Sequence, residues 1–531
     1  MRRRWLMALV SAGVVAAVLV PAGSAAAAGD PVVRTGDGAV RGQVLGNTRV
    51  FQGIPYAAPP VGELRWRDPR PPTRWPGVRD ATGPVPACAQ LPGELPEGST
   101  SEDCLYLNVT APAAARHRPV VVWVHGGGFF MGAGSNYDAR RLVERGDVVV
   151  VTINYRLGVF GFLGMPGLTG SGTFGLADQQ AALRWVRANI DAFGGDPRNV
   201  TIAGQSAGAM SVCAQLTSPS AAGLFDKAVL QSGSCATEFL DNFEYRGEQA
   251  ATIFQPLSSV TEHGREIAAD LGCTDVACLR KLPATDLMAV QQEFIQPAYG
   301  TPVLPRYPGD AVRTGRFHRV PVLSGTTHDE ARPWIAAYDH GTPMSEQTFD
   351  EVLDDTFGAS AEEVRSEYPL AAYGTAALTW AAIVTDRMWA CPQYTTSRGL
   401  AARTPVHQYE FADPAPPPLS PAPPTMPLGA QHASDLWSFF NLGGYQPWFT
   451  PAQQRLSDQM IDYWTAFATT GDPNRAGGPV WPRFSPHRPA VLSLAPDNIT
   501  GVDLATEHHC TFWTTNHQPH SLTIDRGRTH M

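Results

Sequence analysis

Continuous apolar runs recur through the middle of the chain. Residues 118–128, "RPVVVWVHGGG", and 146–156, "GDVVVVTINYR", each hold an unbroken β-branched core, which is the pattern of a strand buried on both faces. Runs of the same kind occupy 198–204, "RNVTIAG", 226–234, "DKAVLQSGS", and 320–330, "VPVLSGTTHDE". Because small or polar residues follow each apolar stretch, the pattern predicts strands whose carboxyl ends open into loops.

Helical patterns separate these strands. Apolar side chains recur at helical spacing over residues 178–195, where Gly194 and Gly195 stop the pattern, and "SAGAMSVCAQLTS" predicts a second helix from residue 206. Alternating strands and helices require crossover connections, so we expect an α/β fold with a large, mostly parallel sheet flanked by helices. Functional residues of such sheets collect beyond the carboxyl ends of the strands. Four polar residues occupy that position: His125, Ser206, Ser232 and Glu330.

Composition and charge limit the classes of molecule that we expect this chain to bind. The chain has 531 residues, 43% of them hydrophobic and 17% charged, which is enough apolar surface for a large core. The formal net charge is -9 and no basic block recurs after the N-terminus, so nucleic acid and anionic membrane surfaces are poor partners. A small-molecule substrate is the better expectation, and the sequence sets no oligomeric state.

The N-terminus has the pattern of an export signal. "MRRRW" is followed by the apolar stretch "LMALVSAGVVAAVLV" and the small residues "GSAAAAGD", which predicts a signal peptide over residues 1–28 and a secreted product. An uncleaved anchor is the alternative, although the run is near the lower length limit of a membrane helix. No later segment is apolar for long enough to span a bilayer. Residues 29–531 are expected to form a single domain, with the proline-rich stretch 412–432 as either a boundary or a stiff loop.

The segment "TIAGQSAGAM" places Ser206 in a G-x-S-x-G motif between a predicted strand and a predicted helix. That context is the one a nucleophile elbow requires, with Gly204 and Gly208 leaving room for a strained turn. A serine hydroxyl is a weak nucleophile without an oriented base, so further groups are needed. "HGGGFF", residues 125–130, offers glycine amides that could hold an oxyanion. A phosphate-binding loop or a plain flexible turn is the alternative for this glycine run.

An acid and then a histidine should follow the serine along the chain. Asp329 and Glu330 lie just past an apolar strand and are both candidates for the acid. The residue pattern favours His432 as the base, because it lies between the proline-rich loop and the predicted helix "ASDLWSFF". The other downstream histidines remain alternatives: His340, His407, His487, His508 and His509.

Long motifs identify the chain as similar to the type-B carboxylesterase and cholinesterase family of α/β-hydrolases. The matching motifs are "FQGIPYAAPPVGELRW", "SEDCLYLNV", "HGGGF", "FGLADQQAALRWVRANIDAFGGDPRNVTIAGQSAGA" and "AVLQSGS". The resemblance implies Ser206 as nucleophile, Glu330 as acid and His432 as base. It also implies that the amides of Gly127, Gly128 and Ala207 form the oxyanion hole and that the Ser232 hydroxyl supports the acid. Neither a metal nor an organic cofactor is expected.

Eight cysteines in an exported chain suggest disulfides, and none has the C-x-x-C spacing of a zinc site. The resemblance implies the pairs Cys88–Cys104, Cys273–Cys278 and Cys391–Cys510. It leaves Cys213 and Cys235 free.

Two departures from the family bear on the substrate. Gln205 stands before the predicted nucleophile where many relatives carry Glu, and the segment between Cys88 and Cys104 has no aromatic residue. Both argue against choline esters. Gln205 removes a negative charge beside the site, and cholinesterases hold a quaternary ammonium with an aromatic ring of that loop. A general carboxylesterase is the main hypothesis. A lipase for long-chain esters, an amidase and a non-catalytic binding protein are the alternatives, and Phe239 is a candidate for either the acyl pocket or the core.

Overall fold

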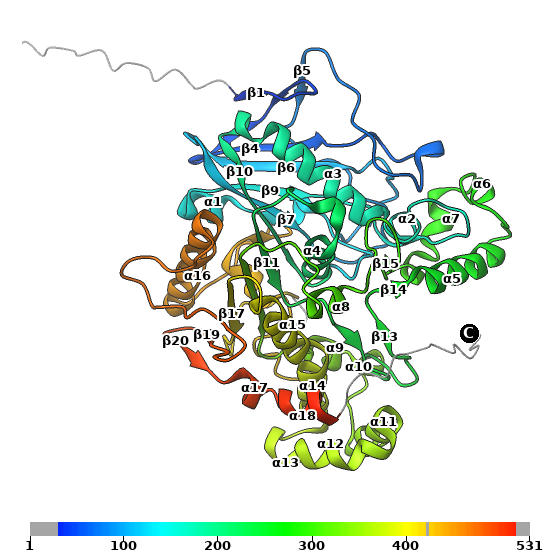
Figure 1. Ribbon diagram of the computed structural model, residues 1–531, viewed down its shortest axis with the longest axis vertical. Coiled ribbons are helices and arrows are strands. Elements are labelled where there is room, and N and C mark those ends of the chain that lie inside the picture. The colour runs from blue at the N-terminus through cyan, green and yellow to red at the C-terminus, as the bar shows by residue number, and fades with distance from the viewer. Residues whose placement is uncertain (1–29, 421–423, 517–531) are drawn as a thin grey trace, which may run out of the picture.

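The computed structural model describes residues 30–420 and 424–516 (Figure 1), and a sheet of eleven strands forms its centre. The order across the sheet is β20-β19-β17-β16-β11-β10-β7-β9-β6-β4-β3. In that order the strands are Asn498–Val502, Val491–Ala495, Val406–Phe411, Val322–Thr327, Lys227–Gln231, Gly195–Gln205, Arg118–Val124, Val149–Ile153, Tyr106–Pro112, Thr48–Pro55 and Gln43–Leu45.

The central strands, from β9 to β19, pair in parallel, and the strands at both edges pair antiparallel. In the middle of the sheet Ala203 of β10 lies opposite Trp123 of β7 and Val229 of β11. Each apolar run identified in the sequence forms one of these parallel strands. The expected mostly parallel sheet is therefore confirmed.

Alternate side chains of the strands enter two separate hydrophobic cores. In β7, Val120, Val122 and Val124 belong to one core, whereas Val121 and Trp123 belong to the other. The helices α3 (Phe174–Asn189), α4 (Ala207–Thr217) and α15 (Cys391–Ala401) cover the first face. The helices α1 (Arg140–Gly146) and α16 (Pro451–Thr470) cover the second face. Burial on both faces explains why these strands are apolar without interruption.

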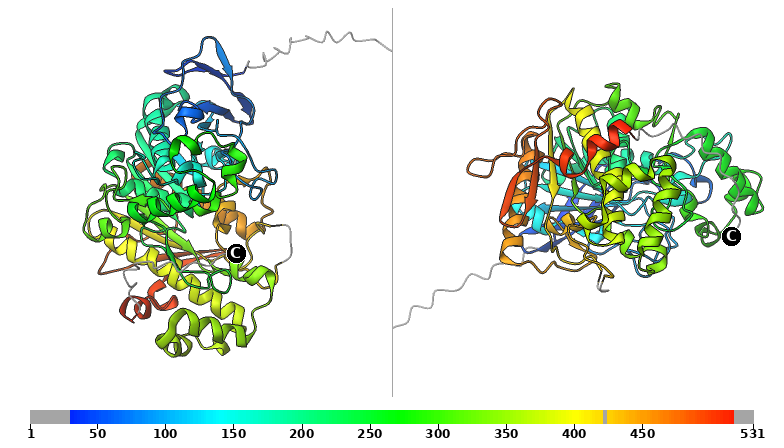
Figure 2. Two further views of the ribbon diagram at one scale, coloured as in Figure 1. Left: turned by 90° about the vertical axis from the view of Figure 1, so that its right-hand side faces the viewer. Right: turned by 90° about the horizontal axis from the view of Figure 1, so that it is seen from below.

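Smaller elements surround this sandwich. A separate sheet of β1, β2 and β5 and the helix group α11 to α13 lie at opposite ends of the molecule (Figures 1 and 2). The remaining helices are α2 (Gly158–Phe162), α5 (Leu257–Asp270), α6 (Val276–Leu279), α7 (Ala284–Met288), α8 (Pro308–Arg313), α9 (Arg332–Ala336), α10 (Tyr338–Gly341), α11 (Glu346–Phe357), α12 (Ala361–Glu367), α13 (Leu370–Tyr373), α14 (Ala376–Val384), α17 (Leu504–Glu507) and α18 (Cys510–Asn516). The remaining strands are β1 (Val32–Arg34), β2 (Ala39–Arg41), β5 (Val78–Asp80), β8 (Tyr137–Asp138), β12 (Glu238–Phe239), β13 (Ala251–Thr252), β14 (Gln255–Pro256), β15 (Ala298–Tyr299) and β18 (Asn441–Leu442).

The proline-rich stretch forms neither a helix nor a strand over its described residues, 412–420 and 424–432. It runs from the end of β17 to His432, as the loop interpretation requires. The helix expected in "ASDLWSFF" is only a short 3-10 helix, Ser434–Ser438. The predicted signal peptide lies outside the described residues, and no helix within the described part is long and apolar enough to cross a membrane.

Four disulfides join the eight cysteines. Three are the pairs implied by the family resemblance, Cys88–Cys104, Cys273–Cys278 and Cys391–Cys510. The expectation that Cys213 and Cys235 are free is wrong, because the structure joins them, with their Cα atoms 5.4 Å apart. Cys213 lies on α4 and Cys235 on the loop after β11. Helix α4 connects β10 to the neighbouring β11, so the crossover brings the two buried cysteines together.

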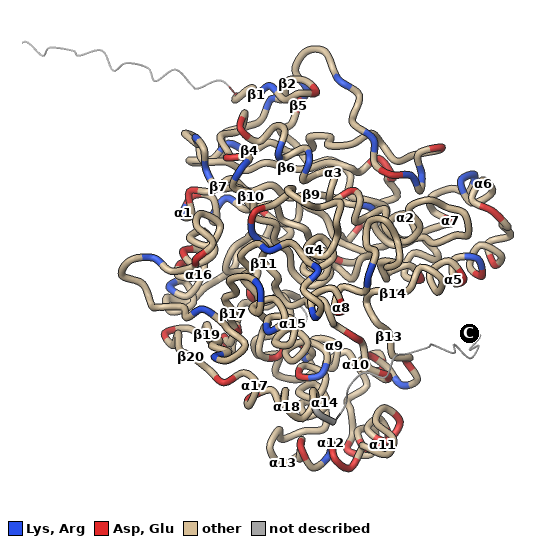
Figure 3. Tube along the Cα trace, viewed as in Figure 1, with Lys and Arg blue, Asp and Glu red and all other residues tan. Residues whose placement is uncertain are grey.

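Over the part of the chain that the structure describes, charged residues are spread along the trace, and no helix or strand there carries a continuous basic run (Figure 3). This distribution agrees with the absence of basic blocks in the sequence beyond the N-terminus.

Candidate active site

Ser206 lies at a sharp turn between the end of β10 and the first residue of α4. Its backbone adopts φ 57° and ψ −127°, a conformation that a residue with a side chain rarely occupies. The turn is held by backbone hydrogen bonds from the Ser206 amide to Gln231 and from the Met210 amide to Ser206. The half-buried side chain of Ser206 therefore stands at the carboxyl edge of the sheet, as a nucleophile elbow requires.

Gly208 permits this turn because helix and sheet approach each other closely. A Cβ atom at Gly208 would lie 2.0 Å from the carbonyl oxygen of Val124, the last residue of β7. At Gly204 it would lie 2.5 Å from the backbone of Gly208. The two glycines of the motif are therefore required by packing between main chains.

His432 and Glu330 form a buried pair beside this turn. The Nδ1 atom of His432 donates a hydrogen bond to Oε2 of Glu330 at 2.5 Å. The other carboxylate oxygen of Glu330 accepts the Thr327 amide at 2.8 Å. With both oxygens bonded and the side chain fully buried, Glu330 fixes the orientation of the imidazole ring.

The second nitrogen of His432 faces the end of β10. The side-chain amide of Gln205 lies 3.0 Å from Nε2, and an amide N–H can only donate to a ring nitrogen that carries no hydrogen. His432 thus holds its proton on Nδ1 and an acceptor on Nε2, the tautomer that a general base requires. Within the described residues, the Ser206 hydroxyl makes no hydrogen bond of its own.

The two candidate acids have different surroundings. The Asp329 carboxylate accepts the Ala430 amide at 2.9 Å and pairs with His328 and Arg332, away from His432. Burial alone would raise the pKa of Asp329, but these partners lower it. The structure therefore brings Glu330, and not Asp329, to His432.

The other candidate histidines lie apart from Ser206. His508 and His509 belong to the C-terminal segment and pair with carboxylates there. Burial lowers the pKa of His407 to about 4, and it lies on β17 near Trp481. His340 belongs to α10 and His487 to the loop before β19.

Two glycines of "HGGGFF" line the pocket that contains Ser206, and their amides have no backbone hydrogen-bond partner among the described residues. Gly127 and Gly128 have φ of 93° and 59°, and neither amide donates a hydrogen bond within the described part of the chain. Ala207 is the first residue of α4, so its amide has no partner one turn earlier in the helix. All three residues line the pocket that contains Ser206.

Ser232 has a different arrangement from the one expected. Its hydroxyl is buried and has no hydrogen-bond partner among the described residues. The amide of Thr327 instead supplies the hydrogen bond that was expected to support Glu330 from Ser232.

The pocket at Ser206 has a volume of about 390 Å³. Trp334 and Trp389 stack on each other, and both rings lie tilted against His432, with centroids 4.9 Å and 4.6 Å from that of the imidazole. Phe239 stacks on Phe243, and both line the pocket. A cavity of about 510 Å³ near α5 is larger, but it contains none of the predicted site residues.

Sequence reasoning missed the acidic part of this lining. Glu94, Glu244 and Glu248 all line the pocket. Glu94 lies in the Cys88–Cys104 segment, and no local motif distinguishes it from Glu97 of the same segment. Nothing in the local pattern of Glu244 and Glu248 distinguishes them from surface glutamates.

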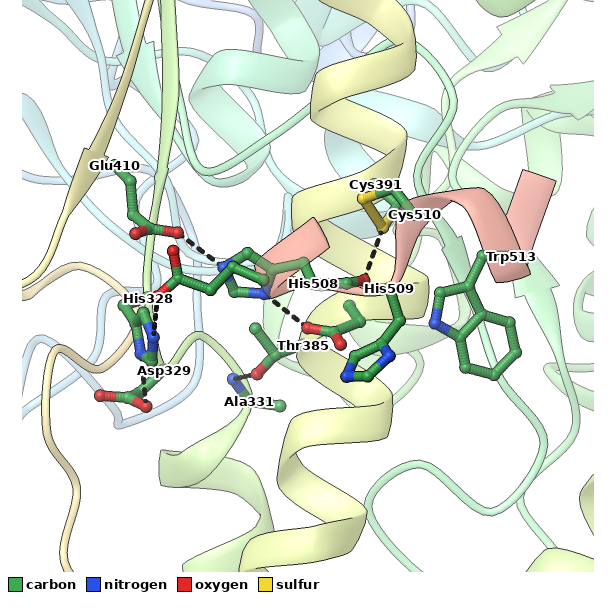
Figure 4. A network of polar contacts seen from close by, with 12 residues as sticks. His328, Asp329, Ala331, Thr385, Cys391, Glu410, His508, His509, Cys510 and Trp513 are labelled. Atoms are coloured by element: carbon green, nitrogen blue, oxygen red, sulfur yellow. Dashed lines mark hydrogen bonds and ion pairs between the residues drawn. A yellow bond between two sulfur atoms is a disulfide. The ribbon is translucent and has the colours of Figure 1, made fainter. Parts of the chain in front are cut away.

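A network of buried charges connects His508 of the C-terminal segment with Glu410 (Figure 4). His508, between α17 and α18, donates through Nδ1 to Asp386 at 2.5 Å and through Nε2 to Glu410 at 2.6 Å. Burial alone would lower the pKa of His508, but the two carboxylates raise it well above the usual range. His508 is therefore an imidazolium that joins the C-terminal segment to β17.

This network also reaches the neighbours of Glu330. The Ala331 amide donates to Thr385, the residue before Asp386, at 3.0 Å. His328, Glu410 and His508 place possible metal-ligand atoms within 4.8 Å of one another. Because both nitrogens of His508 already donate to carboxylates, no lone pair remains on that ring for a metal. The group is better described as an ion-pair network.

Comparison with known proteins supports one family throughout. The model of the carboxylesterase family matches residues 29–513. The para-nitrobenzyl esterase of Bacillus subtilis is 36% identical over 489 residues, which cover 87% of this chain and 94% of that protein. The cocaine esterase of Homo sapiens is 33% identical over 519 residues, which cover 89% of each chain.

Solved structures lead to the same family. A thermophilic PNB esterase has a TM-score of 0.74 at 33% identity, and the match covers 90% of this chain and 99% of that one. A second PNB esterase has a TM-score of 0.73 at 34% identity over 90% of this chain. The chain therefore belongs to the carboxylesterase family and is a type-B carboxylic-ester hydrolase with the α/β-hydrolase fold.

Proposed function

We propose that this enzyme cleaves carboxylic esters through an acyl-enzyme on Ser206, with His432 as general base and Glu330 as the acid that orients it. The main support for this proposal is the chain of hydrogen bonds at His432. Its Nδ1–H donates to Glu330, and its Nε2 acceptor faces the turn that presents Ser206. This is the arrangement of groups that activates a serine hydroxyl.

Gln205 has a defined place in the first step. When substrate binds, the Ser206 hydroxyl must displace the Gln205 amide from Nε2, since one lone pair accepts one strong hydrogen bond. Hydrogen bonds of a catalytic site often form fully only in the substrate complex. Nε2 then takes the hydroxyl proton as Oγ attacks the ester carbonyl carbon.

The tetrahedral intermediate carries its negative charge on the former carbonyl oxygen. The amides of Gly127, Gly128 and Ala207 stabilise that oxyanion, and their lack of backbone partners among the described residues supports this role. His432 returns its proton to the leaving alkoxide, and the alcohol departs. Water, activated by the same His432, then hydrolyses the acyl-enzyme and releases the carboxylic acid.

The protein is proposed to be exported before it acts. Four disulfides among the described residues support maturation in an oxidising compartment, where such bonds persist. The signal peptide predicted over residues 1–28 would direct the chain there.

The test is hydrolysis of p-nitrophenyl acetate and butyrate by the wild type and by Ser206→Ala. We expect kcat to fall by roughly 10⁴-fold or more, because attack and proton transfer act as one unit. Ser259→Ala, on the exposed face of α5, is the matched control and should keep full activity. A folded Ser206→Ala that retained most of its activity would rule out Ser206 as nucleophile.

The acyl-chain series distinguishes the other hypotheses. Rising kcat/KM toward long, insoluble p-nitrophenyl esters would favour a lipase over a short-chain esterase. A folded wild type that is inert toward the whole series would favour a non-catalytic binding protein.

A further inference from the structure

One turn of π-helix, Thr385–Ala390, joins α14 to α15, and we call it the π turn. Helix α14 ends at Val384 and α15 begins at Cys391, so the π turn lies between them without a gap. It packs against β16, the strand that leads to Glu330, and five of its six residues are buried. Single π-helical turns inside α-helices are rare and are often found at functional sites.

The π turn contacts the surroundings of both Glu330 and His432. The amide of Ala331, the residue after Glu330, donates a hydrogen bond to the Thr385 hydroxyl at 3.0 Å (Figure 4). The ring of Trp389 lies against the imidazole of His432, with 4.6 Å between the two ring centroids. A shift of the π turn would therefore move the loop that carries the acid and the ring that packs on the base.

His508 of the C-terminal segment holds the π turn in place. Its Nδ1 atom donates to Asp386 at 2.5 Å, and its Nε2 atom donates to Glu410 of β17 at 2.6 Å (Figure 4). The other carboxylate oxygen of Asp386 accepts the Tyr368 hydroxyl at 2.7 Å. Because His508 is only 3% exposed, solvent and salt screen its attraction to the two carboxylates very little. The π turn is therefore tied to a buried charge.

The other charged groups near His508 are bonded elsewhere. The ring of His328 lies 5.4 Å from that of His508 between centroids, and its nitrogens face Asp329 at 3.0 Å and Glu507 at 3.3 Å. Burial alone would lower the pKa of His508, but its two carboxylate partners raise it well above the usual range. His508 therefore keeps its charge at neutral pH.

A disulfide keeps His508 beside the π turn. Cys391 directly follows the turn, and Cys510 lies two residues after His508. The Cα atoms of the two cysteines are 5.2 Å apart. Because the covalent link already fixes the separation of the two segments, little further ordering entropy is lost when the ion pair forms.

We propose that His508 is a positioning residue for the reaction: its ion pair with Asp386 fixes the π turn and, through it, the acid and the base of the catalytic site. The proposal rests on the proposed function of Ser206 and adds to it a residue that touches no substrate. A displacement of catalytic groups by about 1 Å, caused by a change far from the chemistry, can cost roughly 10²-fold in rate. Loss of the ion pair therefore slows the chemical steps without removing any group that contacts the ester.

The test measures kcat per active site in His508→Gln, with p-nitrophenyl butyrate as substrate. Active sites are counted from the p-nitrophenolate released when diethyl p-nitrophenyl phosphate has reacted to completion, so that unfolded protein does not enter the rate. We expect kcat per titrated site to fall roughly tenfold to a hundredfold, and KM to change much less. A purely structural role would lower the number of titrated sites or the Tm and leave kcat per titrated site unchanged.

Asp386→Asn breaks the same pair from the other side. This variant is expected to fold, because it leaves His508 with one carboxylate partner, Glu410. It should lower kcat per titrated site in the same way. His509→Gln is the matched control, since His509 adjoins His508 and pairs with Glu367 of α12 at 2.6 Å, and not with a residue of the π turn. It should keep the wild-type kcat per titrated site.

Unchanged kcat per titrated site in folded His508→Gln or in folded Asp386→Asn would overturn the proposal, and so would an equal loss in His509→Gln. If His508→Gln does not fold, Asp386→Asn decides. A wild type that releases no p-nitrophenolate in the titration would reject the proposed function of Ser206 and this inference with it. A wild type that titrates normally, beside variants with unchanged kcat, would reject the inference alone.

Discussion

For single residues, the geometry of the site depends on which hydrogen bonds each polar side-chain atom already makes. Glu330 uses both carboxylate oxygens, on Thr327 and on His432, so the imidazole has one orientation. The carboxylate of Asp329, the preceding residue, accepts a hydrogen bond from the Ala430 amide and forms ion pairs with His328 and Arg332. The two adjacent acids therefore have different partners, and only Glu330 bonds to the imidazole of His432.

Glu330→Gln tests the role of the acid. An amide in its place can present N–H to Nδ1 and favour the wrong tautomer of His432, and it removes the charge that stabilises the imidazolium. We expect kcat for p-nitrophenyl butyrate to fall roughly 10³-fold or more, as for other orienting acids.

Asp329→Asn is the matched control for this variant. It should lower kcat far less, because Asp329 does not contact His432. An equal loss in both variants would contradict the assignment of Glu330 as the acid.

At the scale of secondary-structure elements, the turn at Ser206 depends on how closely α4 approaches β7. Gly208→Ala would place a Cβ atom 2.0 Å from the Val124 carbonyl oxygen, and a main-chain atom cannot move away easily. We expect a loss of about 1–3 kcal/mol in the free energy of unfolding, measured with urea. Gly83→Ala is the control, since a Cβ there meets nothing within 4 Å. Equal free energies of unfolding for the two variants would show that α4 can shift away from β7 at no cost in stability.

The ion-pair network between β16, β17 and α17 makes stability depend on pH. Burial alone would lower the pKa of His328, but hydrogen bonds to Asp329 and Glu507 raise it to about 10, with further contributions from Glu410. A pKa that is higher in the folded state means that this stabilisation is complete below pH 6.5. It is lost as the pH rises toward 10.

We therefore expect the free energy of unfolding to decrease from pH 6.5 to pH 10. The part due to His328 should be only about 1 kcal/mol, because solvent screens a side chain that is more than a third exposed. His328→Gln should flatten the dependence over this interval. If the free energy of unfolding of the variant changed with pH as steeply as that of the wild type, His328 would not titrate in this interval.

At the scale of the whole molecule, disulfides join distant parts of the chain. The Cys391–Cys510 bond spans 119 residues and ties α18 to α15, whereas Cys273–Cys278 spans 5. In the loop-entropy account, removing the long link by Cys391→Ala with Cys510→Ala should cost about 4 to 5 kcal/mol of stability. Cys273→Ala with Cys278→Ala should cost much less, as measured by thermal unfolding. The reverse order would show that native packing, and not loop length, governs the effect.

Sequence patterns predicted the sheet well because its strands are buried on both faces and carry a strong apolar signal. Motifs and chain order predicted Ser206, favoured His432 and left Asp329 and Glu330 both open, and the family resemblance implied Glu330. The pairing of Cys213 with Cys235 escaped prediction because it depends on a crossover that brings α4 beside the loop after β11. Glu94 and the Ser232 hydroxyl escaped for a related reason, since the direction of a loop side chain is set by distant contacts.

The most direct measurement of the central claim is titration with diethyl p-nitrophenyl phosphate. Attack by an activated serine oxygen at phosphorus forms a phosphoester on that serine and releases p-nitrophenolate. We expect one p-nitrophenolate per chain, complete loss of esterase activity and a diethylphosphoryl group on Ser206 in peptide mass spectrometry. Label on another residue, or retained activity after one equivalent has reacted, would contradict it.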